Sequence, residues 1–280
     1  MIVKRERGIS PALLIPYVVL SVWALMGLYP YLWMLSSSFK TLPQFFSDNL
    51  SLLPPAWQLD NYRAVWADGF AGFFLNTVMV SGGATLLVIV AASMLGYSLA
   101  FTEFIGRRAL LGLIGLVLFM PPTYNFIPIV KMVALLHLND SLIGVALVMA
   151  TYGLPVSTLL YYGYYRTIPK ELIEAATLDG ATPFRTYVHV VMPLVIPISV
   201  TVGLLQIVSS WNNVVIPLVL TLGNSALETL AVGLYSYNGT HLANYVLICA
   251  GASLSIVPVA LIFLASQRYF VKSIAGALKA

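Results

Sequence analysis

The chain has 280 residues, of which 60% are hydrophobic and only 9% are charged. A soluble domain is typically about 45–50% apolar and about 25% charged, so this composition leaves too few polar groups to cover a soluble surface. Intrinsic disorder is also excluded, because it needs low hydrophobicity and high net charge. We therefore expect an integral membrane protein.

Stretches without Asp, Glu, Lys or Arg predict six transmembrane helices within one domain over residues 1–280. Each stretch exceeds the roughly 20 residues that a helix needs to cross a bilayer, and none alternates as a barrel strand would. The first is too long for the apolar part of a signal peptide, so we expect it to remain uncleaved. Prolines inside the spans are expected to kink them. The predicted spans are 9–35, 74–100, 109–130, 142–165, 190–222 and 244–266.

The positions of Lys and Arg predict the orientation, because these residues gather on the cytoplasmic side of membrane proteins. With the N-terminus inside, only Lys40, Arg63 and Lys131 of the 14 lie outside. Both termini are then cytoplasmic, and the net charge of +4 reflects topology rather than nucleic-acid binding. The inside residues are Lys4, Arg5, Arg7, Arg107, Arg108, Arg166, Lys170, Arg185, Arg268, Lys272 and Lys279.

We find no pattern typical of an enzyme or of a cofactor site. No Gly-Lys dipeptide occurs, so the phosphate-binding loop G-x-x-x-x-G-K-[ST] is absent from the sequence. The histidines His137, His189 and His241 lie far apart, and the single Cys249 lies in an apolar stretch. A secondary transporter is disfavoured, because its usual charged relay is missing from the predicted spans. We expect a non-catalytic chain without a bound metal ion. Any energy for transport is then supplied by a partner protein.

The cytoplasmic segment 166–189 predicts a short helix, a sharp turn and a second helix. Pro169 suits the first position of a helix, and Gly180 suits a left-handed stop. Thr182 and Pro183 are typical of the next helix start. One face of the first helix carries Leu172, Ala175, Ala176 and Asp179, where small side chains would let another surface approach. The alternative is an interfacial helix without a partner.

The same segment resembles a known family motif. Glu174-Ala175-Ala176, three residues, Gly180, nine residues and Val190-Val191-Met192-Pro193 resembles the EAA loop of bacterial ABC-transporter permeases. That family pattern is EAA, three residues, G, nine residues and I-x-L-P. Val190 and Met192 replace the usual Ile and Leu conservatively.

Further stretches resemble the carbohydrate branch of that family, in particular its maltose-type second permease subunit. They are Leu59-Asp60-Asn61-Tyr62, Leu75-Asn76-Thr77, Ser210-Trp211-Asn212-Asn213 with Pro217-Leu218, and the tail from Gln267 to Val271 with Gly276 and Lys279. Asn213 stands where an acidic residue is common, Val214 where an aromatic residue is, and Ser273 where glycine is frequent. The resemblance covers nearly the whole chain.

The resemblance implies an all-α type I importer fold and a role in a binding-protein-dependent sugar importer of a bacterial or archaeal cytoplasmic membrane. The implied partners are a second, different permease subunit, two copies of a cytoplasmic ATPase and an extracytoplasmic sugar-binding protein. ATP and magnesium would be bound by the ATPase. Membrane lipid would surround the chain, and no nucleic acid is expected.

The implied ATPase contact comprises Glu174, Ala175, Ala176, Asp179 and Gly180. Uncharged polar side chains of the spans suit a hydroxyl-rich cargo, although each could instead form a hydrogen bond between helices. These pathway candidates are Asn76, Asn125, Gln206, Ser209, Asn212 and Asn213. The outer segment 223–243 would meet the binding protein. Tyr161, Tyr162, Tyr164 and Tyr165 predict an aromatic belt at the cytoplasmic interface.

Two alternatives remain open. The first is an ABC importer for another solute, such as an amino acid, a peptide or a polyamine. A charged cargo should leave a counter-charge in the outer spans or loops, and the sequence shows no clear one. The second is a membrane receptor or scaffold without transport, which would not co-purify with an ATPase.

Overall fold

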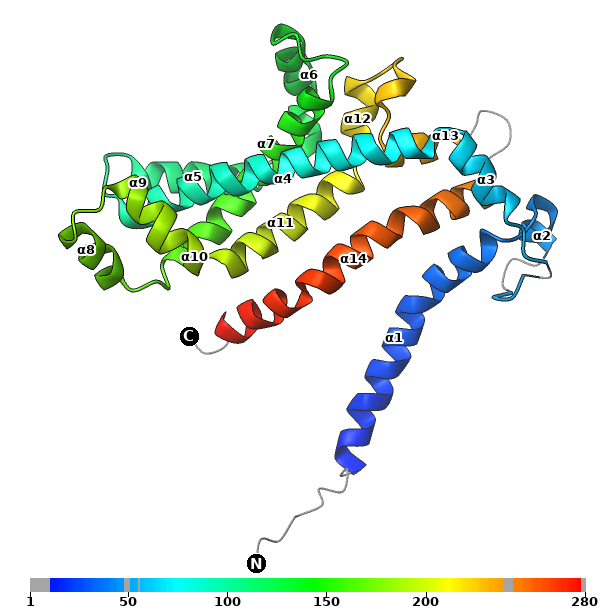
Figure 1. Ribbon diagram of the computed structural model, residues 1–280, viewed down its shortest axis with the longest axis horizontal. Helices are drawn as coiled ribbons and strands as arrows, with labels where there is room; N and C mark the ends of the chain where they lie inside the picture. Colours follow the sequence, from blue (N-terminus) through cyan, green and yellow to red (C-terminus); the bar gives the residue numbers. More distant parts are fainter. Residues whose placement is uncertain (1–10, 48–50, 55, 239–243, 278–280) are drawn as a thin grey trace, which may run out of the picture. The chain divides into compact units, whose positions relative to one another are not determined.

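The computed structural model describes residues 11–47, 51–54, 56–238 and 244–277, in which every regular element is a helix (Figure 1). The chain divides into two compact units. The first contains residues 1–68 with 237–254, and the second contains 69–236 with 255–280. The prediction of an all-α fold is confirmed.

Four helices of the described residues are long and apolar enough to cross a bilayer. They are Leu14–Ser37 within α1 (Pro11–Ser37), α4 (Phe70–Phe101), α7 (Leu142–Tyr165) and Tyr245–Gln267 within α14 (Tyr245–Ala277). They coincide with the first, second, fourth and sixth predicted spans. The total of six spans and the cytoplasmic position of both termini stay predictions.

The third predicted span, 109–130, is not one helix. It contains α5 (Arg107–Val117), a 3-10 turn η1 (Pro122–Asn125) and the first part of α6 (Phe126–Leu135). The break coincides with Pro121 and Pro122. Two successive prolines remove two backbone donors and clash with the preceding turn, so a continuous helix cannot form there.

The fifth predicted span, 190–222, is also broken. A π-helical turn η2 (Tyr187–Val191) leads into α10 (Met192–Leu194), which is followed by α11 (Ile196–Trp211) and α12 (Val215–Leu220). The helical segments before and after Val195 are bent by 79° relative to each other, and together they could form a fifth span. Pro193 and Pro197 flank this bend and account for it, because neither can donate a backbone hydrogen bond.

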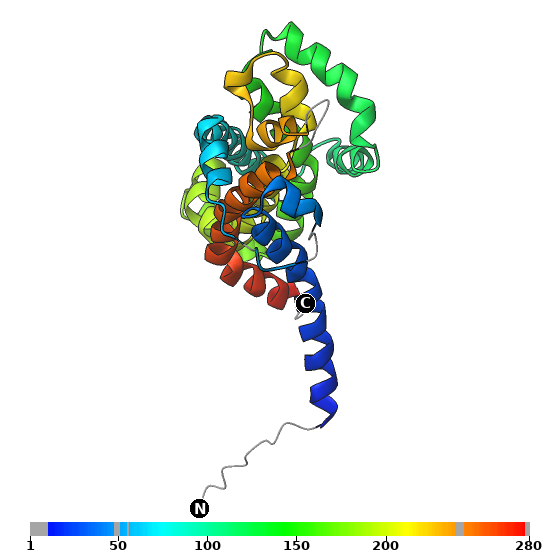
Figure 2. The ribbon, with the colours of Figure 1, turned by 90° about the vertical axis from the view of Figure 1, so that its right-hand side faces the viewer.

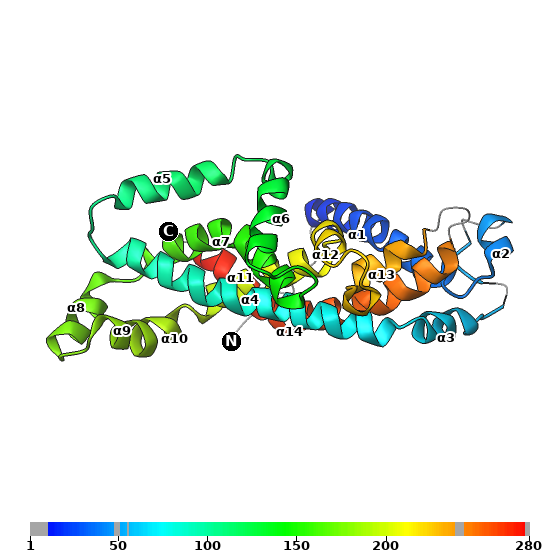
Figure 3. The same ribbon diagram turned by 90° about the horizontal axis from the view of Figure 1, so that it is seen from above.

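The core of the second unit lies between α4, α7 and α11, which run side by side (Figures 1 and 3). Val80, Ala84, Val88 and Ala92 form a buried stripe on α4, because residues four apart share one face of a helix. At Gly96 helices α4 and α7 approach closely, since a Cβ there would lie 2.8 Å from the Cβ of Tyr161. A glycine therefore sets the separation of α4 and α7.

Two of the predicted interfacial tyrosines are instead part of the core. Tyr161 and Tyr165 are 0% exposed, and their rings stack at 5.8 Å. The hydroxyl of Tyr161 donates to Oγ of Ser199 on α11 at 2.7 Å. The belt prediction is wrong for these two residues. Helical spacing puts positions 161 and 165 on the face that meets α4 and α11, and burial on that face outweighs the interfacial preference.

Helices α5 and α6 project to one side of these packed helices (Figures 2 and 3). None of the α5 residues is buried, and Leu113 and Leu116 are 59% and 67% exposed. In a protein of the membrane such a surface contacts lipid or a neighbouring subunit rather than water.

The first unit is organised by two polar side chains. Asn61 of α3 (Asp60–Ala67) donates from Nδ2 to the carbonyls of Ser38 and Lys40 at 2.8 and 2.9 Å. Lys40 is fully buried and donates from Nζ to the carbonyl of Ser51 at 2.8 Å. These bonds hold the predicted outer segment in a folded form. The short α2 (Leu42–Ser47) lies within it.

A second polar contact of this unit joins its two chain segments. Tyr237 donates its hydroxyl proton to Oδ2 of Asp68 at 3.1 Å. Burial, together with the adjacent carboxylate, raises the pKa of Tyr237 to about 12. The phenol therefore stays protonated and remains a donor at physiological pH.

We predict that replacing Gly96 by alanine lowers the thermal stability of the purified protein. The added methyl group would force α4 and α7 apart, and overpacking of this kind costs about 1–3 kcal/mol. Gly112→Ala is the matched control, because a Cβ at Gly112 of α5 would meet no atom within 4 Å. Equal melting temperatures for the two variants would contradict the close approach.

Candidate functional site

The segment 166–189, which the sequence predicts to be cytoplasmic, forms the expected helix, turn and second helix, with one shift in register. Helix α8 (Lys170–Leu178) is followed by α9 (Pro183–Thr186) and then by the turn η2. Pro169 is the N-cap residue with an extended ψ of 131°, rather than the first helical residue. The segment lies at the end of α4 opposite α13 (Leu230–Ser236), as Figures 1 and 3 show.

Gly180 ends α8 as the sequence predicts. Its φ is +80°, the left-handed region that glycine adopts without steric penalty. The N–H of Gly180 donates to the carbonyl of Thr177, and that of Ala181 donates to the carbonyl of Ala176, both at 3.0 Å. These two bonds form a Schellman motif, which satisfies carbonyls that the helix end would leave open.

The next helix begins at the predicted cap. The side chain of Thr182 accepts from the N–H of Arg185 at 3.3 Å, and Pro183 is at the start of α9. The two helices are therefore joined by a turn whose ends are both fixed by local hydrogen bonds, so the segment is suited to move as a rigid piece.

Four of the five predicted contact residues are exposed: Glu174, Ala175, Asp179 and Gly180. Ala176 is the exception, being only 8% exposed against its own chain. Sequence reasoning missed two exposed apolar neighbours, Leu178 at 88% and Phe184 at 67%. Their apolar character at the two ends of a solvent-facing turn was the available signal.

The segment is connected to the packed helices through Tyr187 of η2. Its hydroxyl lies 2.7 Å from Oγ of Ser93 on α4, and both groups are buried. Its ring lies 5.2 Å from that of Tyr97, which is also on α4. Tyr187 therefore joins the segment directly to α4.

Asn76, a predicted pathway residue, has a structural role. It is 7% exposed, and its Nδ2 donates to the carbonyls of Ala226 and Glu228, both at 2.9 Å. The next residue, Thr77, accepts from the N–H of Leu230 at 2.8 Å through its Oγ1. The start of α4 therefore holds the turn η3 (Ser225–Leu227) and the start of α13.

Gln206 is also committed to packing between helices. It is 4% exposed, and its Nε2 donates to the carbonyl of Met149 at 3.2 Å and to Oγ of Ser210 at 2.9 Å. Its Oε1 lies where a Cβ at Gly153 would be. The amide therefore joins α11 to α7 in a space that only a glycine leaves open.

Ser209 and Asn213, in contrast, lie together in a pocket of about 440 Å³ between α6, α7, α11 and α12. We call it the mid-span pocket, because Met149 and Tyr152 line it near the middle of α7. Phe126 supplies a second aromatic ring. These aromatic residues were missed, since a ring in an apolar span gives no signal by itself.

The polar capacity of the mid-span pocket is incompletely used by the protein. Oδ1 of Asn213 accepts from the N–H of Ile216 at 3.0 Å, while its Nδ2 has no hydrogen-bond partner in the described part of the chain. A pocket with two aromatic rings, a hydroxyl and an amide donor suits an uncharged, hydroxyl-bearing molecule.

The remaining two pathway candidates do not join this pocket. Asn212 is exposed, and its Nδ2 donates to the carbonyl of Val208 at 3.0 Å, in its own helix. Asn125 is partly buried and forms the N-cap of α6 without a side-chain bond to it.

A metal centre has no ligand set in the described residues, where no three His, Cys, Asp or Glu side chains come together. Cys249, which lies in an apolar stretch of the sequence, is a buried free thiol. His189 lies 3.2 Å from the carbonyl of Arg185 through Nδ1, and His241 lies outside the described residues.

Residues 89–276 match the model of the family described as binding-protein-dependent transport system inner membrane component. This range includes α8, the Schellman turn, the mid-span pocket and the bend at Val195. The match confirms, at the level of the family, the resemblance that the EAA-type spacing indicated.

Two permeases are similar along most of the chain. The arabinooligosaccharides transport system permease protein AraQ of Bacillus subtilis is 31% identical, covering 90% of this chain and 90% of that protein. The diacetylchitobiose uptake system permease protein NgcG of Streptomyces coelicolor is 29% identical, covering 97% and 88%. A chain in the crystal structure of a bacterial ABC transporter that imports the acidic polysaccharide alginate has the same fold, with a TM-score of 0.79 at 22% identity, covering 95% and 98%.

We predict that Gly153→Ala destabilises the protein by displacing the amide of Gln206. The loss of two hydrogen bonds in a packed interface should lower the melting temperature, whereas Gly163→Ala on the same helix should not, because a Cβ there meets nothing within 4 Å. Adding Gln206→Ala to Gly153→Ala makes room for the methyl group. The double variant should therefore lose less stability than the sum of the losses of the two single variants. A loss equal to that sum would contradict the contact between Gly153 and Gln206.

Proposed function

Because the chain belongs to the family of binding-protein-dependent transport system inner membrane components, we propose that it forms half of the transmembrane pathway of an ATP-driven sugar importer. It is a multi-pass permease of the inner membrane, and members of this family are generally non-catalytic. In the proposed complex a second permease subunit forms the other half of the pathway, and two copies of a cytoplasmic ATPase hydrolyse ATP.

The exposed surface of α8 and its turn supports the ATPase contact. Leu172 and Leu178 are 42% and 88% exposed beside Ala175, so apolar area faces outward from a helix that lies outside the spans. The cost of leaving this area in water favours a partner with an apolar cleft. Ala176 contributes differently from the sequence expectation, because its small side chain lets α8 pack against its own chain.

The route from this contact to the pathway runs through Tyr187. ATPase closure would move α8 and α9 as one piece, because the Gly180 turn and the Thr182 cap fix their connection. Tyr187 would pass the displacement to Ser93 and Tyr97 of α4. The bend at Val195 supplies a place where α11 can change its direction relative to η2.

The mid-span pocket supports an uncharged carbohydrate as cargo. No Asp, Glu, Lys or Arg lines it, so a charged solute would meet no counter-charge there. Tyr152 and Phe126 offer rings for the apolar faces of a sugar, and Ser209 and Asn213 offer hydrogen bonds. The names of the two relatives point to oligosaccharides. An importer for another solute is the alternative, and the absence of a counter-charge is the observation against it.

The outer segment after α12 is the proposed site for the solute-binding protein. Asn76 and Thr77 hold its described part through three hydrogen bonds to backbone groups. A surface fixed to the start of α4 could report docking on the outside to the same helix that Tyr187 contacts at its other end.

We predict that Gly180→Val lowers ATPase recruitment and transport, whereas Gly180→Asn largely retains both. A β-branched residue in the left-handed region costs roughly 1–2 kcal/mol, while asparagine adopts that conformation much more readily. A Cβ at Gly180 would meet nothing within 4 Å, so the difference reports the backbone alone. The two variants are compared by co-purification of the ATPase and by uptake of labelled sugar. Normal values for Gly180→Val would contradict the proposed ATPase contact.

The cargo can be tested with the complete complex in nanodiscs. Its ATPase activity is measured with the binding protein and a panel of monosaccharides, oligosaccharides, amino acids and polyamines. Only the sugars of the panel are expected to stimulate the ATPase activity. If an amino acid or a polyamine stimulates and no sugar does, the carbohydrate assignment is wrong.

We predict that Ser209→Ala and Asn213→Ala raise the sugar concentration needed for half-maximal uptake by roughly two- to tenfold, the effect of losing one neutral hydrogen bond. Asn212→Ala is the matched control, because Asn212 is exposed and bonded only to its own helix. An equal effect of all three substitutions would show that the mid-span pocket is not the site that binds the sugar.

A further inference from the structure

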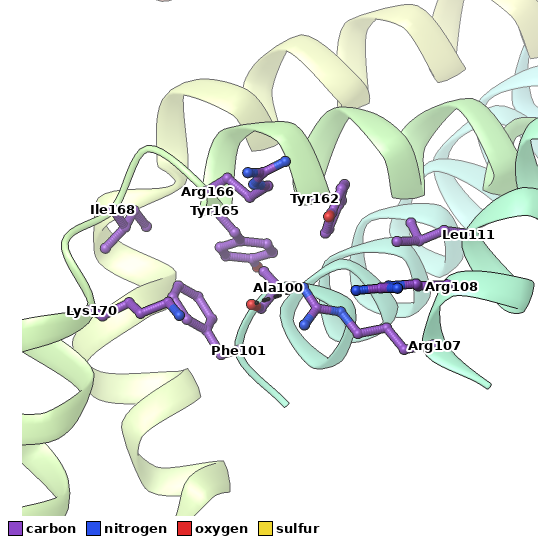
Figure 4. A pocket seen from close by; sticks show the side chains of 10 residues that line it. All are labelled: Ala100, Phe101, Arg107, Arg108, Leu111, Tyr162, Tyr165, Arg166, Ile168 and Lys170. Atoms are coloured by element: carbon purple, nitrogen blue, oxygen red, sulfur yellow. Dashed lines mark hydrogen bonds between the residues drawn. The ribbon is translucent and has the colours of Figure 1, made fainter. Parts of the chain in front are cut away.

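A second pocket, of about 420 Å³, lies where the ends of α4 and α7 meet the starts of α5 and α8 (Figure 4). We call it the basic pocket, because Arg107, Arg108, Arg166 and Lys170 line it. Arg107 and Arg108 extend into it from α5, and Arg166 and Lys170 lie on its other side (Figure 4).

None of these four cations forms an ion pair in the described part of the chain. The ion pair found in the described part of the chain is Arg63 with Asp60, far away in the sequence. Arg107 donates to the carbonyl of Ala100 at 3.5 Å, and the guanidinium of Arg166 lies 5.9 Å from the centre of the Tyr162 ring. Neither contact supplies negative charge, so four like charges converge on one cavity and favour an anion there.

One residue that lines the pocket carries a hydroxyl donor without a partner in the described residues. Tyr165 lines it and is 0% exposed, yet its hydroxyl forms no hydrogen bond in the described residues. An unsatisfied buried hydroxyl costs about 1–3 kcal/mol, which a bound acceptor would recover. Helix α5 begins at Gly106 without a side-chain cap, so its first-turn N–H groups and its positive dipole end lie beside the same cations.

The position of the pocket indicates where such an acceptor comes from. Phe101 and Tyr165 are the last residues of two helices that are long and apolar enough to cross the bilayer, so the pocket lies at headgroup depth. Leu113 and Leu116 of the adjacent α5 are exposed and apolar, as a surface for acyl chains requires. A soluble anion would need only the charged part of this arrangement.

We infer that the basic pocket binds the phosphate group of an acidic phospholipid. Arg107 and Arg108 contact the phosphate from α5, Tyr165 donates its hydroxyl proton to a phosphate oxygen, and the acyl chains lie along α5. With the orientation predicted from the Lys and Arg positions, the lipid belongs to the cytoplasmic leaflet. Lys170 is the first residue of α8, so the bound headgroup also fixes the start of the helix that is proposed to contact the ATPase.

The test uses the full chain in its complex with the other subunits, followed by native mass spectrometry after exchange of the lipids. Phosphatidylglycerol and phosphatidylcholine are added in parallel, and inorganic phosphate is added in a third series. We expect retention of phosphatidylglycerol and not of phosphatidylcholine. The Arg107→Gln/Arg108→Gln variant should lower the affinity roughly 25-fold, at about fivefold for each removed cation near a membrane surface.

Two further variants separate the pocket from general charge. Tyr165→Phe removes only the hydroxyl and should lower the affinity for phosphatidylglycerol roughly fivefold. Arg185→Gln removes an exposed cation of α9 outside the pocket and should leave the affinity unchanged. An equal loss for Arg185→Gln, or none for Tyr165→Phe and the double variant, would overturn the assignment.

The remaining outcomes identify a different occupant and so contradict the inference. Displacement of the lipid by equimolar inorganic phosphate would mean that a soluble anion is the ligand. Loss of ATPase co-purification in the Arg107→Gln/Arg108→Gln variant, with unchanged lipid retention, would mean that carboxylates of the ATPase fill the pocket. Neither outcome bears on the proposed transport of sugar, which the nanodisc ATPase measurements test separately.

Discussion

The close approach of α4 and α7 at Gly96 is the contact on which the second unit depends. A helix pair inside a membrane gains little from burial of apolar area, since lipid is equally apolar, so small residues and tight packing must hold it together. Gly96 provides that packing against Tyr161. Tyr161 and Tyr165 are buried in this part of the core, and Tyr187 lies within hydrogen-bond distance of Ser93 on the same helix as Gly96.

Polar side chains in the spans are divided between two tasks by their neighbours. Asn76 and Gln206 meet backbone carbonyls and a hydroxyl that need donors, so they hold elements together. Ser209 and Asn213 lie beside a cavity with aromatic walls, and Asn213 retains unused donor capacity. Side chains of one chemical type thus serve structure in one place and are available to a cargo in another.

The end of the second unit that carries α8 and α9 combines rigidity with charge. Local hydrogen bonds at Gly180 and Thr182 keep α8 and α9 together, while the prolines around Val195 interrupt the helix that follows. The basic pocket borders the same end, with Lys170 belonging to both. A bound anionic lipid and a bound ATPase would therefore act on neighbouring parts of one rigid piece, and each could influence the other through α8.

The sequence by itself determined the membrane class, four of the long helices and the family, because apolar length, charge position and the EAA-type spacing are properties of the linear chain. It also determined the left-handed stop at Gly180, which depends on local backbone sterics. Only the tertiary structure decided that Tyr161 and Tyr165 are buried, that Gln206 joins α7 to α11, and that Asn213 shares a pocket with Tyr152. Those outcomes depend on which helix faces meet. In uniformly apolar spans the hydrophobic pattern does not distinguish one face from another, so neighbours distant in sequence had to be located before roles could be assigned.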